Sequence, residues 1–358
     1  ATPIGINVRS TVATYAGIHD ELRKLYAKSP DAKALGYKAG DFSYNTGSLR
    51  CPGCDGTGEV SLDVQFLPDV NIPCPDCRGS RYSKAAYTVK LTNKSGAHIS
   101  LPELMDMDVN TAIDFCRDIK SVSQKLEILK QLGLGYLTLG EETPGLSGGE
   151  AQRLKLASEI GKTQEDSVFV FDEPSIGLHP SNIVGLNAVM HDLIADGNSI
   201  ILVDHDTQIL SEADWLIEMG PEAGAGGGYV ITQGSIPQVI AQKESMIGPF
   251  LAGTANMRIR KPIAREDIFA PGKLHLSTDA IHTVKSLEID IPKGRLTVVT
   301  GVSGSGKTTM VLESLIPGLE AKLNGEHLPD HVKSITAEGI AHVKPVSYTH
   351  LTLPTILR

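Results

Sequence analysis

The sequence has no long apolar run. Across its 358 residues, no stretch approaches the roughly 18 apolar residues that a membrane-spanning helix needs, and the N-terminus has no charged segment followed by an apolar one. We therefore expect neither a membrane protein nor a secreted one. The sequence also lacks internal repeats and long low-complexity tracts, which excludes a solenoid.

The chain has no excess of positive charge. It carries 33 Lys and Arg against 42 Asp and Glu, a formal net charge of −9. A strongly basic domain is the usual electrostatic sign of nucleic-acid binding, so any such surface must be local. One local basic stretch contains Arg78, Arg81, Lys84 and Lys90. It suits phosphate contacts and an ordinary solvated face about equally well.

Cysteine is scarce, and its placement is not that of a disulfide framework. Four of the five cysteines form two CxxC pairs, Cys51 with Cys54 and Cys74 with Cys77, and nineteen residues separate the pairs. Four thiolates at this spacing predict a closed tetrahedral Zn²⁺ site with a structural role, in a reducing cytoplasm. Free thiols or two disulfides are the alternatives. Cys116 lies in a helical pattern and is predicted to be a core residue.

The length suggests about two domains, and the apolar periodicity predicts helices and strands in both. Helical patterns cover residues 14–27, 103–132 and 147–160. Alternating apolar residues predict a strand over Val60–Phe66, which would form a hairpin between the cysteine pairs.

Two apolar runs indicate a parallel sheet. Val168–Phe171 and Ile200–Val203 flank a helical stretch, residues 182–194, as in a βαβ unit of a buried parallel sheet. The fold class is therefore α/β. A second lobe is predicted to begin near residue 256, and Val346–Arg358 resembles translated cloning sequence more than native protein.

A glycine-rich segment of the second lobe predicts a phosphate-binding loop. Residues 301–308 fit the pattern GxxxxGK[ST] and follow a predicted strand, Leu296–Thr300. The loop's backbone amides would cradle the phosphates of ATP, Lys307 would contact the β and γ phosphates, and the Thr308 hydroxyl would ligate Mg²⁺. The residues predicted to bind nucleotide here are Gly301, Gly304, Ser305, Gly306, Lys307, Thr308 and Thr309.

Acidic residues follow the first apolar run of the βαβ unit. Asp172 is the candidate Mg²⁺ ligand and Glu173 the candidate catalytic base. Taken alone, the pair fits an ordinary strand end that reaches a polar loop. His205 follows the second run, and alone it fits an ordinary surface histidine.

A helix start precedes the parallel strands. Ser147 and Glu150 have the spacing of a capping box, and Gly148 and Gly149 leave bare amides between them. This segment is either an ordinary cap or an anion site for a γ-phosphate.

Taken together, these segments resemble the motifs of one known ATPase family and follow one another in the order found in that family. Leu146–Arg153 resembles the signature motif of ATP-binding-cassette ATPases, Asp172–His179 their Walker B motif and D-loop, and Val203–His205 their switch histidine. With the cysteine module placed before the signature, residues 1–345 resemble the UvrA family, the DNA-damage-recognition ATPases of the ABC excinuclease. Further matching segments are Pro3–Gly5, Ala13–Tyr15, Phe66–Val70, Gly133–Tyr136 and Ala213–Trp215.

The resemblance implies an ATP-binding-cassette, P-loop ATPase fold with an inserted four-cysteine zinc module. It also implies a cytoplasmic ATPase that binds double-stranded DNA and recognises damage in nucleotide-excision repair, with ATP, Mg²⁺ and Zn²⁺ as cofactors. A UvrB-like partner and a homodimer of the full-length protein follow from the same resemblance. The alternatives are a UvrA-like protein for self-resistance to a DNA-binding drug and a nucleotide-gated DNA-binding module with little hydrolysis.

The resemblance also implies a division of the chain, with two departures from the family pattern. The expected parts are a connecting segment over residues 1–50, the zinc module over 51–82, the signature and Walker B part over 83–255, and the phosphate-loop lobe over 256–345. The phosphate loop comes last here, about 130 residues after Asp172, which predicts a fragment or a permuted relative. Ala1 stands where the family carries its Q-loop glutamine.

Overall fold

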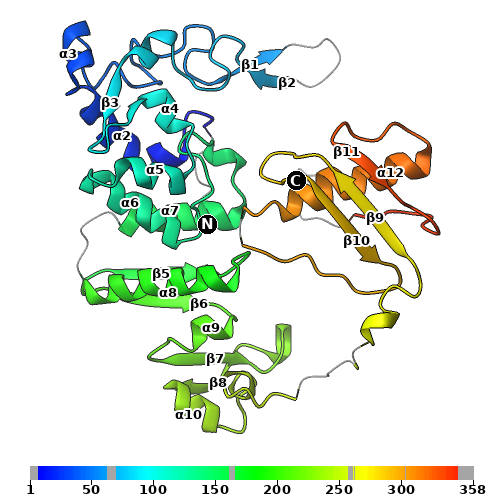
Figure 1. Ribbon diagram of the computed structural model, residues 1–358. Coiled ribbons are helices and arrows are strands. Elements are labelled where there is room, and N and C mark those ends of the chain that lie inside the picture. The colour runs from blue at the N-terminus through cyan, green and yellow to red at the C-terminus, as the bar shows by residue number, and fades with distance from the viewer. Residues whose placement is uncertain are drawn as a thin grey trace, which may run out of the picture. The chain divides into compact units, whose positions relative to one another are not determined.

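The computed structural model describes residues 7–62, 70–160, 166–256, 261, 263–302 and 304–345. The chain divides into two compact units, residues 1–255 and residues 256–358 (Figure 1). The second half of the predicted strand at residues 60–66, the position of Ala1, and the predicted tail lie outside the described residues.

The first unit is built around a helical core. Most of its buried apolar side chains meet in one cluster, whose fully buried members include Tyr26, Leu104, Leu126 and Leu129. The helices of the first part are α1 (Val12–Tyr15), α2 (Ile18–Tyr26), α3 (Pro30–Leu35), a 3₁₀ turn at Lys84–Thr88, α4 (Leu101–Met105), α5 (Val109–Cys116), α6 (Lys120–Gln131), a 3₁₀ turn at Thr143–Gly145 and α7 (Gly148–Ile160). The structure thus confirms the helical patterns over residues 103–132 and 147–160.

The helix predicted over residues 14–27 forms in two pieces. α1 ends at Tyr15 and α2 begins at Ile18, because Gly17 lies between them with φ +65°. Glycine adopts this left-handed conformation at no steric cost. Apolar spacing continues across the break, so the sequence pattern alone did not reveal it.

The βαβ unit forms as predicted. β5 (Val168–Asp172) pairs in parallel with β6 (Ser199–Val203), and α8 (Pro180–Ala195) connects them. Phe169 and Phe171 pack against the helical core, whereas Val168 and Val170 on the other face are 62% and 66% exposed. The prediction of a sheet buried on both faces is wrong for the described residues, because only one face is covered.

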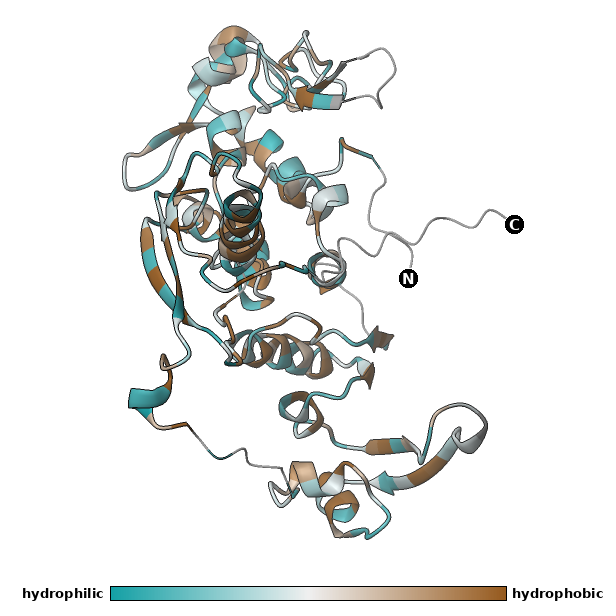
Figure 2. Cartoon of the chain, turned by 90° about the vertical axis from the view of Figure 1, so that its right-hand side faces the viewer, coloured by the Kyte–Doolittle hydropathy of each residue, from teal (hydrophilic) through white to brown (hydrophobic). Residues whose placement is uncertain are grey.

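The described part of the first unit also contains three antiparallel strand pairs. β1 (Glu59–Leu62) pairs with β2 (Val70–Pro73), which confirms the hairpin predicted between the cysteine pairs. β3 (Lys90–Thr92) pairs with β4 (His98–Ser100), and β7 (Leu216–Gly220) with β8 (Tyr229–Gly234). Figure 2 shows hydrophobic residues on β7 and β8, at the bottom of the view. The remaining helices are α9 (Thr207–Leu210), a 3₁₀ turn at Gly224–Gly226, α10 (Ile236–Ala241) and α11 (Gly248–Leu251).

The second unit packs a helix on a small sheet. β9 (Lys273–Thr278) lies between β10 (Leu287–Pro292) and β11 (Val332–Ile335), both antiparallel to it. A π-helical segment, Thr309–Leu315, continues into α12 (Ile316–Asn324), whose Leu319 packs with Leu276 of β9. A 3₁₀ turn lies at Arg265–Asp267.

The strand predicted over Leu296–Thr300 does not form. These residues follow β10 without regular structure, and Leu296 and Val298 are 81% and 74% exposed. A strand needs a neighbour for its backbone N–H and C=O groups, and none of the described strands pairs with this segment. Apolar composition was therefore insufficient to predict the strand.

Candidate functional site

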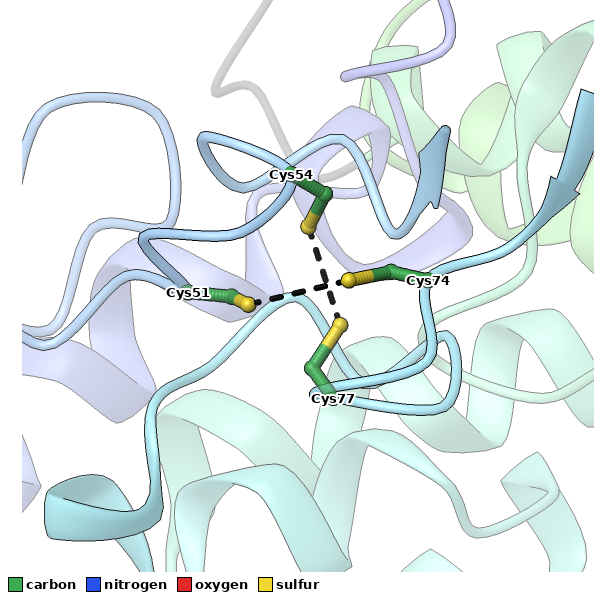
Figure 3. A group of neighbouring side chains, drawn as sticks. All are labelled: Cys51, Cys54, Cys74 and Cys77. Atoms are coloured by element: carbon green, nitrogen blue, oxygen red, sulfur yellow. Dashed lines mark hydrogen bonds between the residues drawn. The ribbon is translucent and has the colours of Figure 1, made fainter. Parts of the chain in front are cut away.

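The four paired cysteines converge on one point. The Sγ atoms of Cys51, Cys54, Cys74 and Cys77 all lie within 4.8 Å of one another, and all four residues are buried (Figure 3). The Sγ–Sγ distances are 3.9 Å for Cys51–Cys74 and 3.6 Å for Cys54–Cys77. Four thiolates around one Zn²⁺, with Zn–S bonds of about 2.3 Å, require sulfur separations of about 3.8 Å. The four residues therefore fit a tetrahedral metal, as the sequence predicted.

Each CxxC pair is followed by the same backbone turn. Asp55 and Arg78, directly after the second cysteine of each pair, have φ values of +51° and +52°, and Gly56 and Gly79 follow at +78° and +89°. Gly56 is required here, because an added Cβ would lie 1.7 Å from the carbonyl oxygen of Tyr44. The turns aim backbone amides at the sulfurs, and the amide of Gly58 donates to Cys54 Sγ over 3.2 Å.

The surroundings of the thiols change their pKa values in different directions. Burial raises the pKa of Cys51, and it raises the pKa of Cys77 to about 12. Burial acts in the same direction on Cys54, but the amide of Gly58 and the neighbouring thiols outweigh it and lower the pKa of Cys54. A cation among the four sulfurs would favour the thiolate at every position. Cys116 is fully buried in the helical core, as predicted, and burial raises its pKa to about 12.

The ends of β5 and β6 bring two of the predicted catalytic residues together. Glu173 lies just after β5 with φ +48°, and its amide donates to the carbonyl of Val203 over 2.7 Å. His205 lies just after β6, and its Nδ1 is 4.0 Å from Glu173 Oε1. Asp172, the last residue of β5, is exposed beside them. Parallel strands place their carboxyl ends at one edge of the sheet, which explains this grouping.

Asp204 organises the loops at this edge, and the sequence did not single it out. Its carboxylate accepts a hydrogen bond of 2.8 Å from the Ser175 hydroxyl and one of 3.2 Å from the Ser175 amide. It also accepts from the amides of His205 and Asp206, over 2.7 Å and 2.9 Å. One carboxylate thus joins the loop after β5 to the loop after β6. Its position between an apolar run and His205 was the only signal in the sequence.

The predicted capping box forms at the start of α7. The amide of Ser147 donates to Glu150 Oε2 over 2.7 Å, and the amide of Glu150 contacts Ser147 Oγ over 3.4 Å. The hydroxyl of Tyr136 donates to the other oxygen of Glu150. Burial acts to raise the pKa of Glu150, but these hydrogen bonds outweigh it and lower that pKa.

The same helix contacts the loop that follows β5. Arg153 is buried, and its Nη1 donates to the carbonyl of Ile176 over 3.4 Å. Gly149 lies against the same carbonyl, since an added Cβ there would be 2.9 Å from the Ile176 oxygen. Ser147 and Gly148 remain exposed at the helix start. The start of α7 therefore packs against the loop after β5 through Gly149 and Arg153.

The glycine-rich loop of the second unit contains glycines in the left-handed conformation. Gly304 and Gly306 have φ values of +74° and +84°, and a Cβ on Gly306 would lie 2.4 Å from Val284 Cγ2. Lys307 curls over the loop, and its Nζ donates to the carbonyls of Gly301 and Val302 over 2.7 Å and 2.8 Å. Helical structure begins at Lys307 and continues through Thr308 and Thr309. Ser305 is exposed beside them.

One of the basic residues predicted at the surface is buried instead. Arg81 is 3% exposed, and its guanidinium pairs with Glu142 over 2.5 Å. It is therefore not available for phosphate contacts, which corrects the sequence interpretation. Arg78, Lys84 and Lys90 are exposed, and Lys90 lies 4.0 Å from Glu103.

Within the described ranges, no helix has both the length and the apolar character that crossing a lipid bilayer demands.

Most of the chain is similar to known proteins of one name. No protein-family model matches the chain. The chain is 41% identical over 266 residues to UvrABC system protein A of Thermus thermophilus, covering 74% of this chain and 27% of the relative. It is also 41% identical over 256 residues to the protein of the same name from Streptococcus mutans, covering 71% of this chain and 27% of the relative. The chain thus spans about a quarter of the length of the curated relatives it matches.

A solved structure supports the same conclusion. UvrA2 from Deinococcus radiodurans matches with a TM-score of 0.62 and 38% identity, over 71% of this chain and 31% of that one. The match, the βαβ unit and the four-cysteine cluster together identify an ATP-binding-cassette fold with an inserted zinc module. The chain belongs to the UvrABC system protein A family.

Proposed function

We propose that these residues form part of an ATPase that binds DNA and recognises damage in nucleotide-excision repair. The observation that carries the proposal is the meeting of Glu173 and His205, 4.0 Å apart, beside the strand end that bears Asp172. A carboxylate next to a metal-binding acid can activate a water molecule, and a neighbouring imidazole can donate a hydrogen bond to the γ-phosphate. The family membership supports the same activity.

Each residue proposed to bind or hydrolyse ATP has a role that its chemistry supports. Lys307 would exchange the two loop carbonyls it now contacts for oxygens of the β and γ phosphates. Glu173 would accept the proton of the attacking water, and His205 would hold the γ-phosphate. Separately, the exposed start of α7, with the Ser147 hydroxyl and the amides of Gly148 and Gly149, would offer an anion site for a γ-phosphate.

Two metals complete the proposal. Mg²⁺ would neutralise phosphate charge, and the candidate ligands are Asp172 in the first unit and the Thr308 hydroxyl in the second. Zn²⁺, held by Cys51, Cys54, Cys74 and Cys77, would stabilise the module without an open position for catalysis.

The proposed macromolecular partners are double-stranded DNA and a UvrB-like protein, with a homodimer in the full-length protein and a cytoplasmic location. Exposed Arg78, Lys84 and Lys90 near the zinc module support a phosphate-contacting surface there. Neutralising these charges should weaken DNA binding by the same factor for every DNA sequence, and it should reduce the dependence of binding on salt concentration.

The experiment that tests the proposal compares ATP binding and hydrolysis, with and without duplex DNA, in the wild type and in Lys307→Ala. We expect the variant to lose tight ATP binding, because the charge opposite the phosphates is gone. Lys322→Ala is the matched control, since Lys322 is exposed on α12 of the same unit. Equal ATP binding by wild type and Lys307→Ala would overturn the proposed nucleotide site.

A further inference from the structure

Arg81 touches both cysteine turns of the zinc module. It follows Cys77 by four residues, and its carbonyl accepts the amide of Cys51 over 2.9 Å. Its Nη1 lies 3.5 Å from the carbonyl of Gly56, which belongs to the other turn. The guanidinium also lies 5.4 Å from the ring centre of Tyr44. The position of Arg81 is therefore set by the closed arrangement of both CxxC pairs.

The far end of the Arg81 side chain reaches the segment that leads into α7. Its Nη2 donates to Glu142 Oε1 over 2.5 Å, and the side chains of the two residues are 4% and 28% exposed. Glu142 forms a β-bridge with Thr11. The amide of Thr143, the next residue, donates to the carbonyl of Ser10 over 3.0 Å. Ser147, the capping residue of α7, is five residues beyond Glu142.

The buried position makes this ion pair costly to break. A buried guanidinium needs its ion-pair partner. Removing one partner of a buried ion pair lowers stability far more than removing one partner of an exposed pair, because the remaining charge stays buried without compensation. Among the described residues, Glu142 is the only carboxylate that forms a salt bridge with Arg81. When the cysteine turns shift, Arg81 must either carry Glu142 with it or lose its partner.

We infer that Arg81 is a positioning residue that couples the four-cysteine module to the start of the signature helix through Glu142. The inference rests on the proposed function, because the position of Ser147 matters to ATP only if this helix contacts a phosphate. The coupling itself is a property of the first unit and can be measured without nucleotide.

The test is amide hydrogen exchange of residues 143–150 in the full chain, zinc-loaded and after chelation. In the loaded wild type we expect slow exchange, and we expect chelation to raise it. In Glu142→Gln, the loaded protein should already exchange about fivefold faster or more at these residues, with zinc content unchanged, because Glu142 lies outside the module. Chelation should then add less than about twofold, because the connection is already broken.

A neighbouring glutamate supplies the control. Glu141→Gln removes the adjacent carboxylate, which accepts from the Thr138 amide and does not contact Arg81, so it should leave exchange at residues 143–150 as in the wild type. Arg81→Met should reproduce Glu142→Gln where the module keeps its zinc. The inference is overturned if Glu142→Gln leaves exchange unchanged, or if chelation raises exchange equally in wild type and Glu142→Gln. Neither outcome bears on ATP hydrolysis, so the two proposals fail separately.

Discussion

The side-chain amide of Gln152 donates to the backbone carbonyl of Asp172 over 2.5 Å. This hydrogen bond joins α7, the helix of the signature segment, to the last residue of β5. A backbone carbonyl at a strand end has no partner in the sheet and needs one from elsewhere. The position of Asp172 is therefore linked to the helix that begins at Gly148.

Replacing Gln152 by Leu should weaken this connection. The variant keeps the side-chain volume and loses the donor, so we expect the free energy of unfolding to fall by about 1 kcal/mol. Denaturant titration of the full chain measures the change. Gln208→Leu, on short helix α9 and without a side-chain hydrogen bond among the described contacts, is the comparison, and an equal loss in both variants would contradict the prediction.

Purified protein should contain one equivalent of zinc under reducing conditions. Cys51→Ser and Cys77→Ser should each lose most of it, because the closed site needs four sulfurs. Cys116→Ser should retain the full amount, since Cys116 is buried in the helical core. Metal analysis of the purified proteins measures the zinc content. Less than about half an equivalent of zinc in the wild type would contradict the prediction of a four-cysteine zinc site.

Glu173→Gln should preserve ATP binding and slow hydrolysis by at least about 100-fold, because the variant lacks the proposed base and keeps Asp172, the proposed metal ligand. Single-turnover hydrolysis and equilibrium ATP binding, measured on the same preparation, separate the two effects. Glu212→Gln, at an exposed glutamate paired with His191 on the same unit, should change neither. Equal hydrolysis rates in wild type and Glu173→Gln would remove Glu173 from the mechanism.

Acid should destabilise the first unit through His19. Burial, aided by the charge of Arg23, lowers the pKa of His19 to about 3, whereas the unfolded chain takes up a proton near pH 6.5. Below pH 6.5 the unfolded state thus binds more protons, and stability falls until the pH reaches the folded pKa. The loss approaches about 1.4 kcal/mol per pH unit between the two pKa values.

His19→Gln isolates this effect, because Gln can still donate to the Tyr82 hydroxyl that now lies 2.8 Å from His19 Nε2. Between pH 6.5 and 5, before most carboxylates titrate, the wild type should lose stability with a steeper slope than the variant. Denaturant midpoints across this range supply the comparison. Parallel slopes would mean that His19 does not titrate between the two states.

The sequence predicted the parts that depend on local pattern. The four cysteines, the capping box at Ser147 and the strands at residues 168 and 200 follow from spacing and apolar periodicity, and all of them form. The burial of Arg81 and the hydrogen bonds from Ser175 to Asp204 depend on residues more than twenty positions apart, which spacing does not encode. The prediction of a strand at residues 296–300 was wrong for the same reason, because a strand forms only where a neighbouring strand can pair with it.

The two adjacent glycines of the signature segment should respond oppositely to alanine. A Cβ at Gly149 would lie 2.9 Å from the carbonyl oxygen of Ile176 and 3.1 Å from Arg153 Nη1, whereas a Cβ at Gly148 meets nothing within 4 Å. Gly149→Ala must therefore displace a backbone carbonyl or a buried guanidinium, at a cost of about 1–3 kcal/mol. Gly148→Ala should be neutral or stabilising by up to about 1 kcal/mol, because alanine favours helix more than glycine does.

Denaturant unfolding of both variants tests this contrast in one experiment. The two substitutions add the same methyl group to neighbouring positions of α7, so helix propensity acts on both in the same direction. Any difference must then come from the contacts of Gly149 with Ile176, in the loop after β5, and with Arg153. If Gly149→Ala proved as stable as Gly148→Ala, the close approach of α7 to that loop would not exist in solution.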